Sequence, residues 1–320
     1  MLGRAMPDLG PAVDTTLRRC LAVKAGENVL VVVDPATRAI GEAIREGAAR
    51  LGADAVLLVM DERADHGSEP APPVAAAMAA CDVFIAPTTK SLSHTEARRR
   101  ACEAGARGAT MPGVTEDMLA RVMAIDFEQM AARSHAVARL LGRGSSAHIG
   151  CRDGTDLTLN LTGRDGAADD GDLTAPGAFG NLPAGEGFIS PVNAAGKLVP
   201  TSLAGVGLAR ERPTLTIDNG RLSGASGEAG GTLLGLLDPF GELGRNVAEL
   251  GVGTNESATL TGNVLEDEKM LGSVHVAFGA SAGIGGSVSV PIHIDVVVAN
   301  ASLTIDGRPV LDDGRYVLDA

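Results

Sequence analysis

The sequence contains few aromatic residues. They make up 2% of its 320 residues, with six Phe, one Tyr and no Trp. Proteins that stack nucleic-acid bases use aromatic side chains for this purpose, so such a platform is not expected. The formal net charge of −13 indicates the same, because surfaces that bind phosphate backbones are basic. We therefore expect no nucleic-acid partner.

Long apolar runs and paired cysteines are also absent. No stretch of about 18 apolar residues occurs, which excludes a transmembrane helix and predicts no membrane partner. The opening residues, MLGRAMPDLGPAVD, lack the apolar centre of a secretion signal, so we expect a cytoplasmic protein. The cysteines form no CxxC motif, which is typical of idle or buried thiols. They are Cys20, Cys81, Cys102 and Cys151.

The first half of the chain alternates short apolar runs with amphipathic segments. At about 100–200 residues per domain, the length of 320 residues predicts two domains. Continuous apolar runs such as NVLVVVD are typical of strands buried on both faces, and their alternation with helices predicts a parallel α/β sheet. Strands are expected over 28–34, 55–60, 82–87 and 106–111, and helices over 36–51, 73–80, 95–103, 116–124 and 127–141.

The pattern changes near the GRGSS segment at 142–146. The second half is rich in glycine, and its apolar residues occur in short alternating runs separated by Asp-Gly and Asn-Gly turns, which is typical of antiparallel strands. We predict an α/β domain over 1–145 and a β-rich domain over 146–320. Strands are expected over 156–161, 198–203, 214–217, 273–278, 291–298 and 302–305, and one helix over 230–237.

The glycine-rich segments do not predict a nucleotide site. The turn after the first strand is DPAT at 34–37, not the GxGxxG that lets backbone approach a pyrophosphate, and no P-loop occurs. The other glycine clusters lie in the β-rich half, outside any βαβ unit. We interpret Gly205–Gly207, Gly251–Gly253 and Gly283–Gly286 as turns or bulges.

Histidines and carboxylates occur within apolar segments of the second half. His293 and Asp295 lie two residues apart in PIHIDVVV, so both side chains project from one face of a strand. Burying them costs several kcal/mol unless the two groups pair with each other or bind a ligand. His275 lies in another apolar strand, Glu186 follows a Pro-Gly turn, and Glu249 lies inside an apolar stretch.

These five residues match a metal site in number and type. Imidazole and carboxylate ligands suit Zn, Co, Mn or Fe(II) better than Ca, and two bridged ions would need about five or six such ligands. The run Glu266–Lys269 is a further candidate, but we expect this run of charges to form a solvated turn. His66, His135 and His148 have no such context and are expected to be structural.

Four segments of the second half resemble the aminopeptidase T family of metallo-aminopeptidases, also called the thermophilic metalloprotease family. They are NLPAGEGFISP at 181–191, AELGVGTN at 248–255, LEDEKMLGSVHVAFG at 265–279 and HID at 293–295. In the first half, SLSHTEARRRACEAGARGATMPG at 91–113 is similar to a stretch in shorter members. The resemblance implies an N-terminal α/β domain, a C-terminal β-rich domain and a homodimer.

The resemblance also implies a metal site and an activity. The metal ligands would be Glu186, Glu249, His275, His293 and Asp295, and they would hold two divalent ions of Zn, Co or Mn. An aminopeptidase of this leucyl type removes N-terminal residues from peptides with a metal-activated water. Glu186 or Glu249 would shuttle the proton as the catalytic residue. This hydrolase is the main hypothesis from the sequence.

The plan is also similar to that of a mononuclear iron enzyme, 2,5-dihydroxypyridine 5,6-dioxygenase. His275, His293 and Asp295 alone would form a 2-His-1-carboxylate set, which suits non-heme Fe(II). Peptidase members carry a tyrosine seven residues after the first histidine, whereas this chain has Ala282 there and its only tyrosine is Tyr316. A ring-cleaving Fe(II) dioxygenase is therefore the alternative hypothesis. A third is a protein with a structural metal or none, which binds a partner.

The substrate, a peptide or another small molecule, is expected to contact the first half. His94, Arg98 and Arg107 lie where the 91–113 segment leaves a strand, and ligands of open α/β sheets bind at such strand ends. An arginine there could hold a substrate carboxylate. We therefore name His94 and Arg98 as substrate-binding candidates, with a solvated helix face as the other interpretation.

Overall fold

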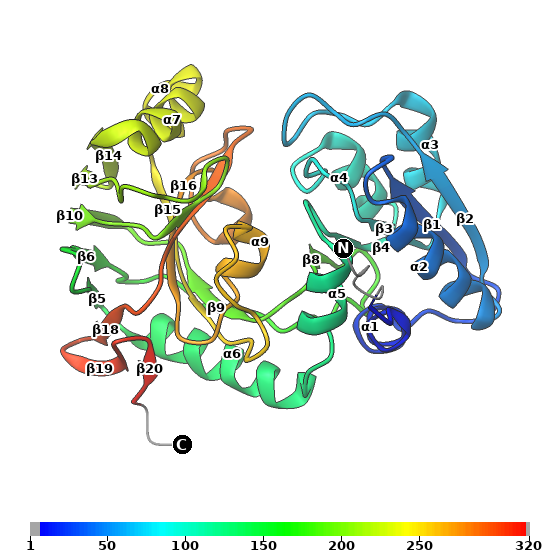
Figure 1. Ribbon diagram of the computed structural model, residues 1–320, viewed down its shortest axis with the longest axis horizontal. Helices are drawn as coiled ribbons and strands as arrows, with labels where there is room; N and C mark the ends of the chain where they lie inside the picture. The colour runs from blue at the N-terminus through cyan, green and yellow to red at the C-terminus, as the bar shows by residue number, and fades with distance from the viewer. Residues whose placement is uncertain (1–6, 318–320) are drawn as a thin grey trace, which may run out of the picture. The chain divides into compact units, whose positions relative to one another are not determined.

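The computed structural model describes residues 7–317 of the chain, which form two compact units (Figure 1). The first unit comprises residues up to Asp126 together with Gly171–Ala184, and the second comprises Phe127–Asp170 and the chain from Gly185 onward. The chain thus changes unit three times, and the boundary predicted near residue 145 falls within the second unit.

The first unit contains a parallel five-stranded sheet with the order β2-β1-β3-β4-β8. This confirms the predicted α/β architecture. The inner strands β1 and β3 are the continuous apolar runs, and almost all of their residues are buried. Strand β2 was expected to be buried, but it lies at the sheet edge, where Val56 and Val59 are about half exposed. The strands are β1 (Asn28–Val33), β2 (Asp54–Val59), β3 (Val83–Ala86), β4 (Arg107–Thr110) and β8 (Phe179–Asn181).

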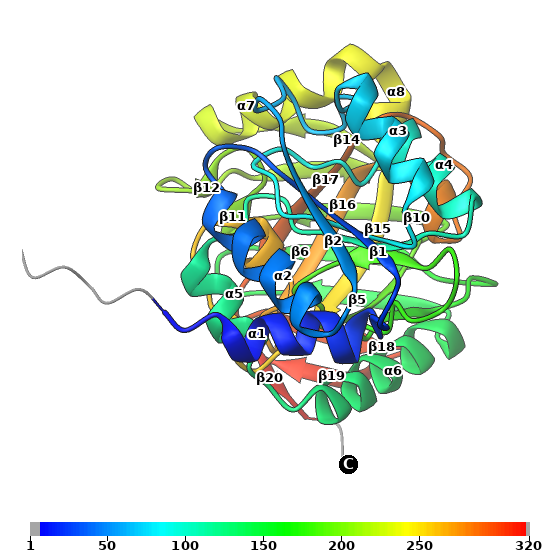
Figure 2. The same ribbon diagram turned by 90° about the vertical axis from the view of Figure 1, so that its right-hand side faces the viewer.

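Helices cover this sheet, as the alternating pattern predicts. Helix α2 lies against β1 and β2, and its buried residues include Ile40, Ile44 and Ala48, which share one face (Figure 2). Threonines cap two of the helices, since Thr95 and Thr115 accept the backbone N–H groups of Arg98 and Met118. The helices are α1 (Gly10–Asp14), a π-helical turn (Thr15–Cys20), α2 (Arg38–Arg50), α3 (Pro72–Ala80), α4 (Glu96–Glu103) and α5 (Glu116–Val122).

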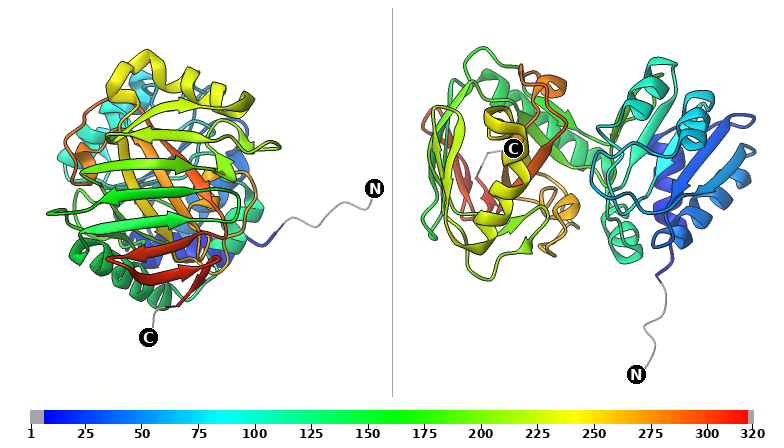
Figure 3. Two further views of the ribbon diagram at one scale, coloured as in Figure 1. Left: turned by 90° about the vertical axis from the view of Figure 1, so that its left-hand side faces the viewer. Right: turned by 90° about the horizontal axis from the view of Figure 1, so that it is seen from above.

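The second unit is built on two antiparallel sheets (Figure 3). The eight-stranded sheet has the order β14-β13-β10-β6-β5-β18-β19-β20, and the seven-stranded sheet the order β12-β11-β17-β16-β15-β9-β7. The first contains β5 (Ser146–Gly150), β6 (Asp156–Asn160), β10 (Asn193–Leu198), β13 (Leu215–Asp218), β14 (Arg221–Ala225), β18 (Ser302–Ile305), β19 (Arg308–Asp312) and β20 (Arg315–Tyr316). The second contains β7 (Ala167–Asp169), β9 (Glu186–Ile189), β11 (Ser202–Leu203), β12 (Gly207–Leu208), β15 (Val247–Gly253), β16 (Val274–Gly279) and β17 (His293–Val298).

The predicted hairpin turns are confirmed in the second unit. Asn219, Asp306 and Asp313 have φ angles of 49°, 48° and 48°, and each is followed by a glycine with positive φ. Two successive positive φ angles are what the tight turns of antiparallel hairpins require. These turns join β13 to β14, β18 to β19 and β19 to β20.

Helices complete the second unit. Helix α6 packs along β7 and β9 so closely that a Cβ on Gly187 would lie 2.7 Å from the Val137 side chain. The expected helix near 230–237 is confirmed as α7. The elements are α6 (Phe127–Arg143), α7 (Gly227–Leu237), a 3-10 turn (Asp238–Phe240), α8 (Gly241–Gly244), α9 (Val264–Asp267) and a second 3-10 turn (Ala282–Ile284).

Side chains alternate along three strands of the seven-stranded sheet, so one face of the sheet is apolar and the other carries the candidate ligands. We call the second the ligand face. Leu250, Val276 and Val296 belong to the apolar core that also contains Ile149 and Leu159 of the other sheet. Because side chains alternate along a strand, the residues between them project from the opposite face. Those intervening residues carry the carboxylates and imidazoles of the candidate site.

The fold contains no element suited to crossing a membrane within residues 7–317. None of the helices there combines the length and the apolarity that a bilayer span requires.

Candidate metal centre

The register between neighbouring strands brings the five predicted ligands together on the ligand face of the sheet. Ala277 of β16 lies between Glu249 of β15 and Asp295 of β17, so these two carboxylates project from one line across the sheet. Two residues further along β15, Gly251 pairs with His275 of β16. Two residues beyond that, Gly253 pairs with Glu186 of β9. Four strands that are distant in sequence thus place the side chains that the sequence analysis singled out side by side.

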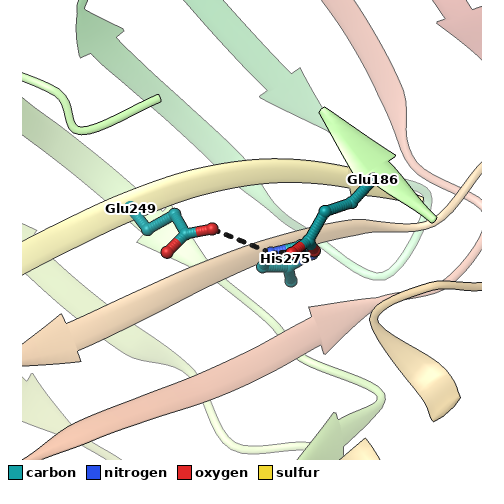
Figure 4. A group of neighbouring side chains, drawn as sticks. All are labelled: Glu186, Glu249 and His275. Atoms are coloured by element: carbon teal, nitrogen blue, oxygen red, sulfur yellow. Dashed lines mark ion pairs between the residues drawn. The ribbon is translucent and has the colours of Figure 1, made fainter. Parts of the chain in front are cut away.

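The carboxylate of Glu249 lies between the two imidazoles. Its Oε1 is 3.5 Å from Nε2 of His275, and its Oε2 is 3.3 Å from Nε2 of His293. Glu186 approaches His275 from the other side, with 3.2 Å between Oε2 and Nε2 (Figure 4). Asp295 Oδ1 lies 3.5 Å from Nε2 of His293. Glu249 is therefore shared by two groups of three potential ligands.

The spacing within each group suits a metal ion. In the Glu186–Glu249–His275 group and in the Glu249–His293–Asp295 group, one donor atom per residue lies within 4.8 Å of the others. Donors bound at about 2.1 Å to one ion lie roughly 3 to 3.5 Å apart. Glu186 Oε2 is buried and has no hydrogen-bond partner, which is the state expected of an atom that a metal ion satisfies. The residues present therefore fit a divalent metal.

Backbone contacts fix the orientation of one histidine. Nδ1 of His293 lies 2.8 Å from the carbonyl oxygen of Ala280, which assigns a proton to Nδ1 and makes Nε2 the nitrogen that faces the carboxylates. His275 is 1% exposed and has no hydrogen-bond partner at Nδ1. Both imidazoles thus present Nε2 to the centre.

The buried carboxylates of the centre need positive charge beside them, which is also what a bound metal cation would supply. Burial lowers the pKa of His275, but the charge of Glu186 and the hydrogen bond of Glu249 outweigh it and raise the pKa to about 9. Burial acts in the same way on His293, and Asp295 and Glu249 raise its pKa well above the usual value. For Glu249, burial raises the pKa, but the two histidines outweigh it and lower the pKa. Protons on the imidazoles therefore balance carboxylates that a metal ion would otherwise neutralise.

The glycines of β15 make room for the site. We interpreted Gly251 and Gly253 as turn or bulge residues, but both lie inside a fully buried strand. A Cβ on Gly251 would be 2.1 Å from the imidazole of His275, and one on Gly253 would be 2.1 Å from the Met270 carbonyl oxygen. The GxG pattern in this strand therefore reflects side chains and backbone packed directly on it.

The run Glu266–Lys269 is buried, so the prediction of a solvated turn was wrong. Glu266 Oε1 accepts the backbone N–H of Thr259, and Asp267 accepts backbone N–H groups of a neighbouring loop, which satisfies both carboxylates. Lys269 is 2% exposed. The charges in this run were misjudged because their partners lie elsewhere in the chain.

Lys269 joins the centre, a contact that we did not predict from the sequence. Its Nζ lies 2.6 Å from Glu186 Oε1, 3.0 Å from Glu268 Oε1 and 3.5 Å from Asp169 Oδ2. Burial lowers the pKa of Lys269, but the charges of Glu186 and Glu268 outweigh it and raise it well above its usual value. The position of Lys269 in the motif with His275 was the only sequence signal for this contact.

The substrate-binding candidates of the first half have different environments. Arg98 donates from Nε to the Ser93 carbonyl, and its guanidinium lies 4.4 Å from the centre of the Phe179 ring. His94 is exposed in the turn before α4. Arg107 is buried and forms a bidentate ion pair with Glu27. It therefore has a structural role and not the substrate contact that we considered.

Ala282 stands at the position where peptidase members have a tyrosine, so no phenol comes from there. The only tyrosine of the chain is Tyr316, and its hydroxyl is bonded elsewhere. Ala282 begins a 3-10 turn, and the hydroxyl of Tyr316 donates to the Gly253 carbonyl oxygen at 2.8 Å. That carbonyl belongs to the backbone of β15, so Tyr316 anchors the strand that carries Glu249. Tyr316 therefore has a structural role, which is to hold β15 through this hydrogen bond.

A protein-family model matches residues 8–318, and its description is 2,5-dihydroxypyridine 5,6-dioxygenase. The chain belongs to this family. Its fold is similar to a solved structure of 2,5-dihydroxypyridine dioxygenase from Pseudomonas putida KT2440, with a TM-score of 0.79, 20% identity and 97% of each chain covered. It is also similar to wild-type AmpT from Thermus thermophilus, with a TM-score of 0.67, 20% identity and coverage of 97% of this chain and 99% of that one. Among curated proteins, none matches the chain by sequence.

The family overturns the main hypothesis from the sequence. We interpreted the motifs as those of a zinc, cobalt or manganese aminopeptidase, a metalloprotease and hydrolase, but the model that matches nearly the whole chain describes a dioxygenase. The fold is similar to that of AmpT as well, so likeness to that protein shows the architecture and not the reaction. The resemblance was sound for the architecture and wrong for the reaction.

Proposed function

We propose that this protein is a non-heme Fe(II) dioxygenase that opens the ring of a dihydroxylated pyridine. The family match over residues 8–318 carries the proposal. His275, His293 and Asp295 would supply the 2-His-1-carboxylate set that Fe(II) oxygenases use. His293 and Asp295 belong to one of the two ligand groups and His275 to the other, and Glu249 belongs to both. Glu249 lies between the imidazoles and adds a second carboxylate to the centre.

The chemistry of the bound metal is to bring the ring and dioxygen together and to exchange electrons with both at positions that the protein leaves open. The reaction adds both atoms of O2 across the C5–C6 bond of the ring, which breaks. The ring carbons lose the electrons that the two oxygen atoms gain, so no external reductant is consumed. The product has the composition of the substrate plus O2.

The protein residues hold and shield the centre. His293 is kept in register by its Nδ1 contact to the Ala280 carbonyl, and His275 is held over the bare backbone of Gly251. Glu186, Glu249 and His275 are almost fully buried, whereas the His293 and Asp295 side chains are 15% and 19% exposed. Substrate therefore approaches the centre from the side of His293 and Asp295. Burial of the other three excludes water that would compete for the ligand positions.

Oxygen consumption tests the proposal. Protein loaded anaerobically with Fe(II) is mixed with 2,5-dihydroxypyridine and isotopically labelled dioxygen. We expect equimolar uptake of oxygen and a ring-opened product that carries both labelled atoms. The same protein loaded with Zn(II), which has no redox chemistry, is the matched control and should consume none. Absence of uptake by fully iron-loaded protein with this and related dihydroxylated pyridines would overturn the proposal.

A further inference from the structure

The two groups of ligands share Glu249 but differ in their contact with a cation. In the Glu186–Glu249–His275 group, the ammonium of Lys269 is bonded to Glu186 Oε1 at 2.6 Å. In the Glu249–His293–Asp295 group, the two carboxylates form ion pairs only with histidines within the described part of the chain. One group therefore holds a lysine ammonium, which the other group lacks among the described residues.

The ammonium has few alternatives to this position. Lys269 is 2% exposed and follows the short helix α9, so its side chain is enclosed by the protein. Glu268 and Asp169 lie 3.0 and 3.5 Å from Nζ and complete its surroundings with further carboxylate oxygens. A buried lysine without such partners would be strongly destabilised, so these contacts hold the charge beside Glu186.

We infer that Lys269 takes the place of a second metal cation and limits the centre to one ion. Like charges at short distance in a buried site repel strongly. A divalent ion on Glu186, Glu249 and His275 would share the Glu186 carboxylate with the ammonium. The remaining group of Glu249, His293 and Asp295 has no such competitor, and His275 adjoins it at 3.5 Å from Glu249 Oε1. This inference rests on the proposed metal function and assigns the cause of the single-ion stoichiometry that the function requires.

The inference predicts that removing the ammonium creates a second metal site. In Lys269→Met, Glu186 Oε1 would lose its ammonium partner, and Oε2, which has no hydrogen bond, already faces His275 at 3.2 Å. Two ions would then share Glu249 as a bridge. Glu186→Gln in the same variant removes the carboxylate that the second ion needs, so the double variant should return to one ion.

Mn2+ is the probe, with stoichiometry from calorimetry and elemental analysis of the full chain. We expect one ion per chain for the wild type, two for Lys269→Met, and one for Lys269→Met with Glu186→Gln. Electron paramagnetic resonance provides an independent readout, because two bridged Mn2+ ions couple their spins. Lys197→Met, at an exposed position of β10, is the matched control and should bind one ion.

Two results would overturn the inference. They are a wild type that binds two ions, and Lys269 variants that still bind only one. Lys269→Gln keeps a donor beside Glu186 without the charge, so it serves where the methionine variant does not fold. A wild type that binds one ion and consumes no oxygen would contradict the proposed function while leaving the inference supported. The two failures are therefore distinguishable.

Discussion

The imidazole of His275 lies directly over the α-carbon of Gly251 on the neighbouring strand. The two residues are opposite each other in the β15–β16 pair, and a Cβ on the glycine would be 2.1 Å from both Cε1 and Nε2 of the ring. A bare backbone at this position lets the ring come close to the neighbouring strand and direct Nε2 toward Glu186 and Glu249. A missing side chain on one strand thus positions a ligand on the next.

Gly251→Ala is expected to weaken metal binding with little other change in the fold. The backbone of Gly251 does not have a positive φ, so the effect is steric and falls on His275. Loss of a contact that orients a ligand typically costs about 10- to 100-fold in metal affinity. Competition with a metal indicator measures this change. Gly231→Ala, where a Cβ on α7 meets nothing within 4 Å, is the control and should leave affinity unchanged.

His293→Ala is expected to abolish metal binding and to remove the sensitivity of stability to chelators. An ion that binds only the folded state stabilises it by about 2.7 kcal/mol at one hundred times its Kd. Chelation should therefore lower the Tm of the wild type but not that of the variant. His148→Ala, which breaks only an exposed pair with Asp156, should behave as the wild type. Full metal content in His293→Ala would show that the ligand set is wrong.

Arg98→Gln is expected to raise KM about tenfold with kcat nearly unchanged, which is the signature of lost substrate binding. The guanidinium is fixed by Ser93 and Phe179. Its neighbour Arg99 is exposed and forms ion pairs with Glu96 and Glu103. Arg99→Gln is therefore a control in the same helix, and we expect it to leave KM unchanged. Equal KM values for the two variants would assign Arg98 to packing alone.

The ion pair between Glu27 and Arg107 is expected to make the protein sensitive to acid. Burial raises the pKa of Glu27, but the hydrogen bond from Arg107 and that from the Lys24 backbone N–H outweigh it and lower the pKa below 4.5. Because the folded-state pKa is depressed, the contribution to stability is complete above the unfolded value and is lost as the pH falls through the folded one. Urea unfolding of wild type and Glu27→Gln at pH about 6 and about 4 measures this loss.

Glu27→Gln should reduce the difference in stability between the two pH values and cost about 1 to 3 kcal/mol near neutrality, the usual worth of a hydrogen bond to a charged group. Glu42→Gln is the matched control. Its ion pair with Arg38 is exposed, and such pairs contribute about 1 kcal/mol or less. An equal loss in both variants would contradict the assigned role of the Glu27 pair.

Patterns within single segments predicted much of the fold correctly. Continuous apolar runs identified β1 and β3, and Asn-Gly and Asp-Gly pairs identified three hairpin turns, because both signals depend only on neighbouring residues. The edge position of β2 was not predictable in this way. Its apolar run resembles that of an inner strand, and only the order of strands in the sheet exposes Val56 and Val59.

The sequence by itself determined that His293 and Asp295 share one face, since residues two apart in a strand always do. It also determined that each expected ligand lies in an apolar frame. Only the tertiary structure decided that Glu249 lies between two imidazoles and that Lys269 reaches Glu186, 83 residues away in the chain. Register between strands and the burial of a charge depend on contacts between distant segments, and no local pattern encodes such contacts.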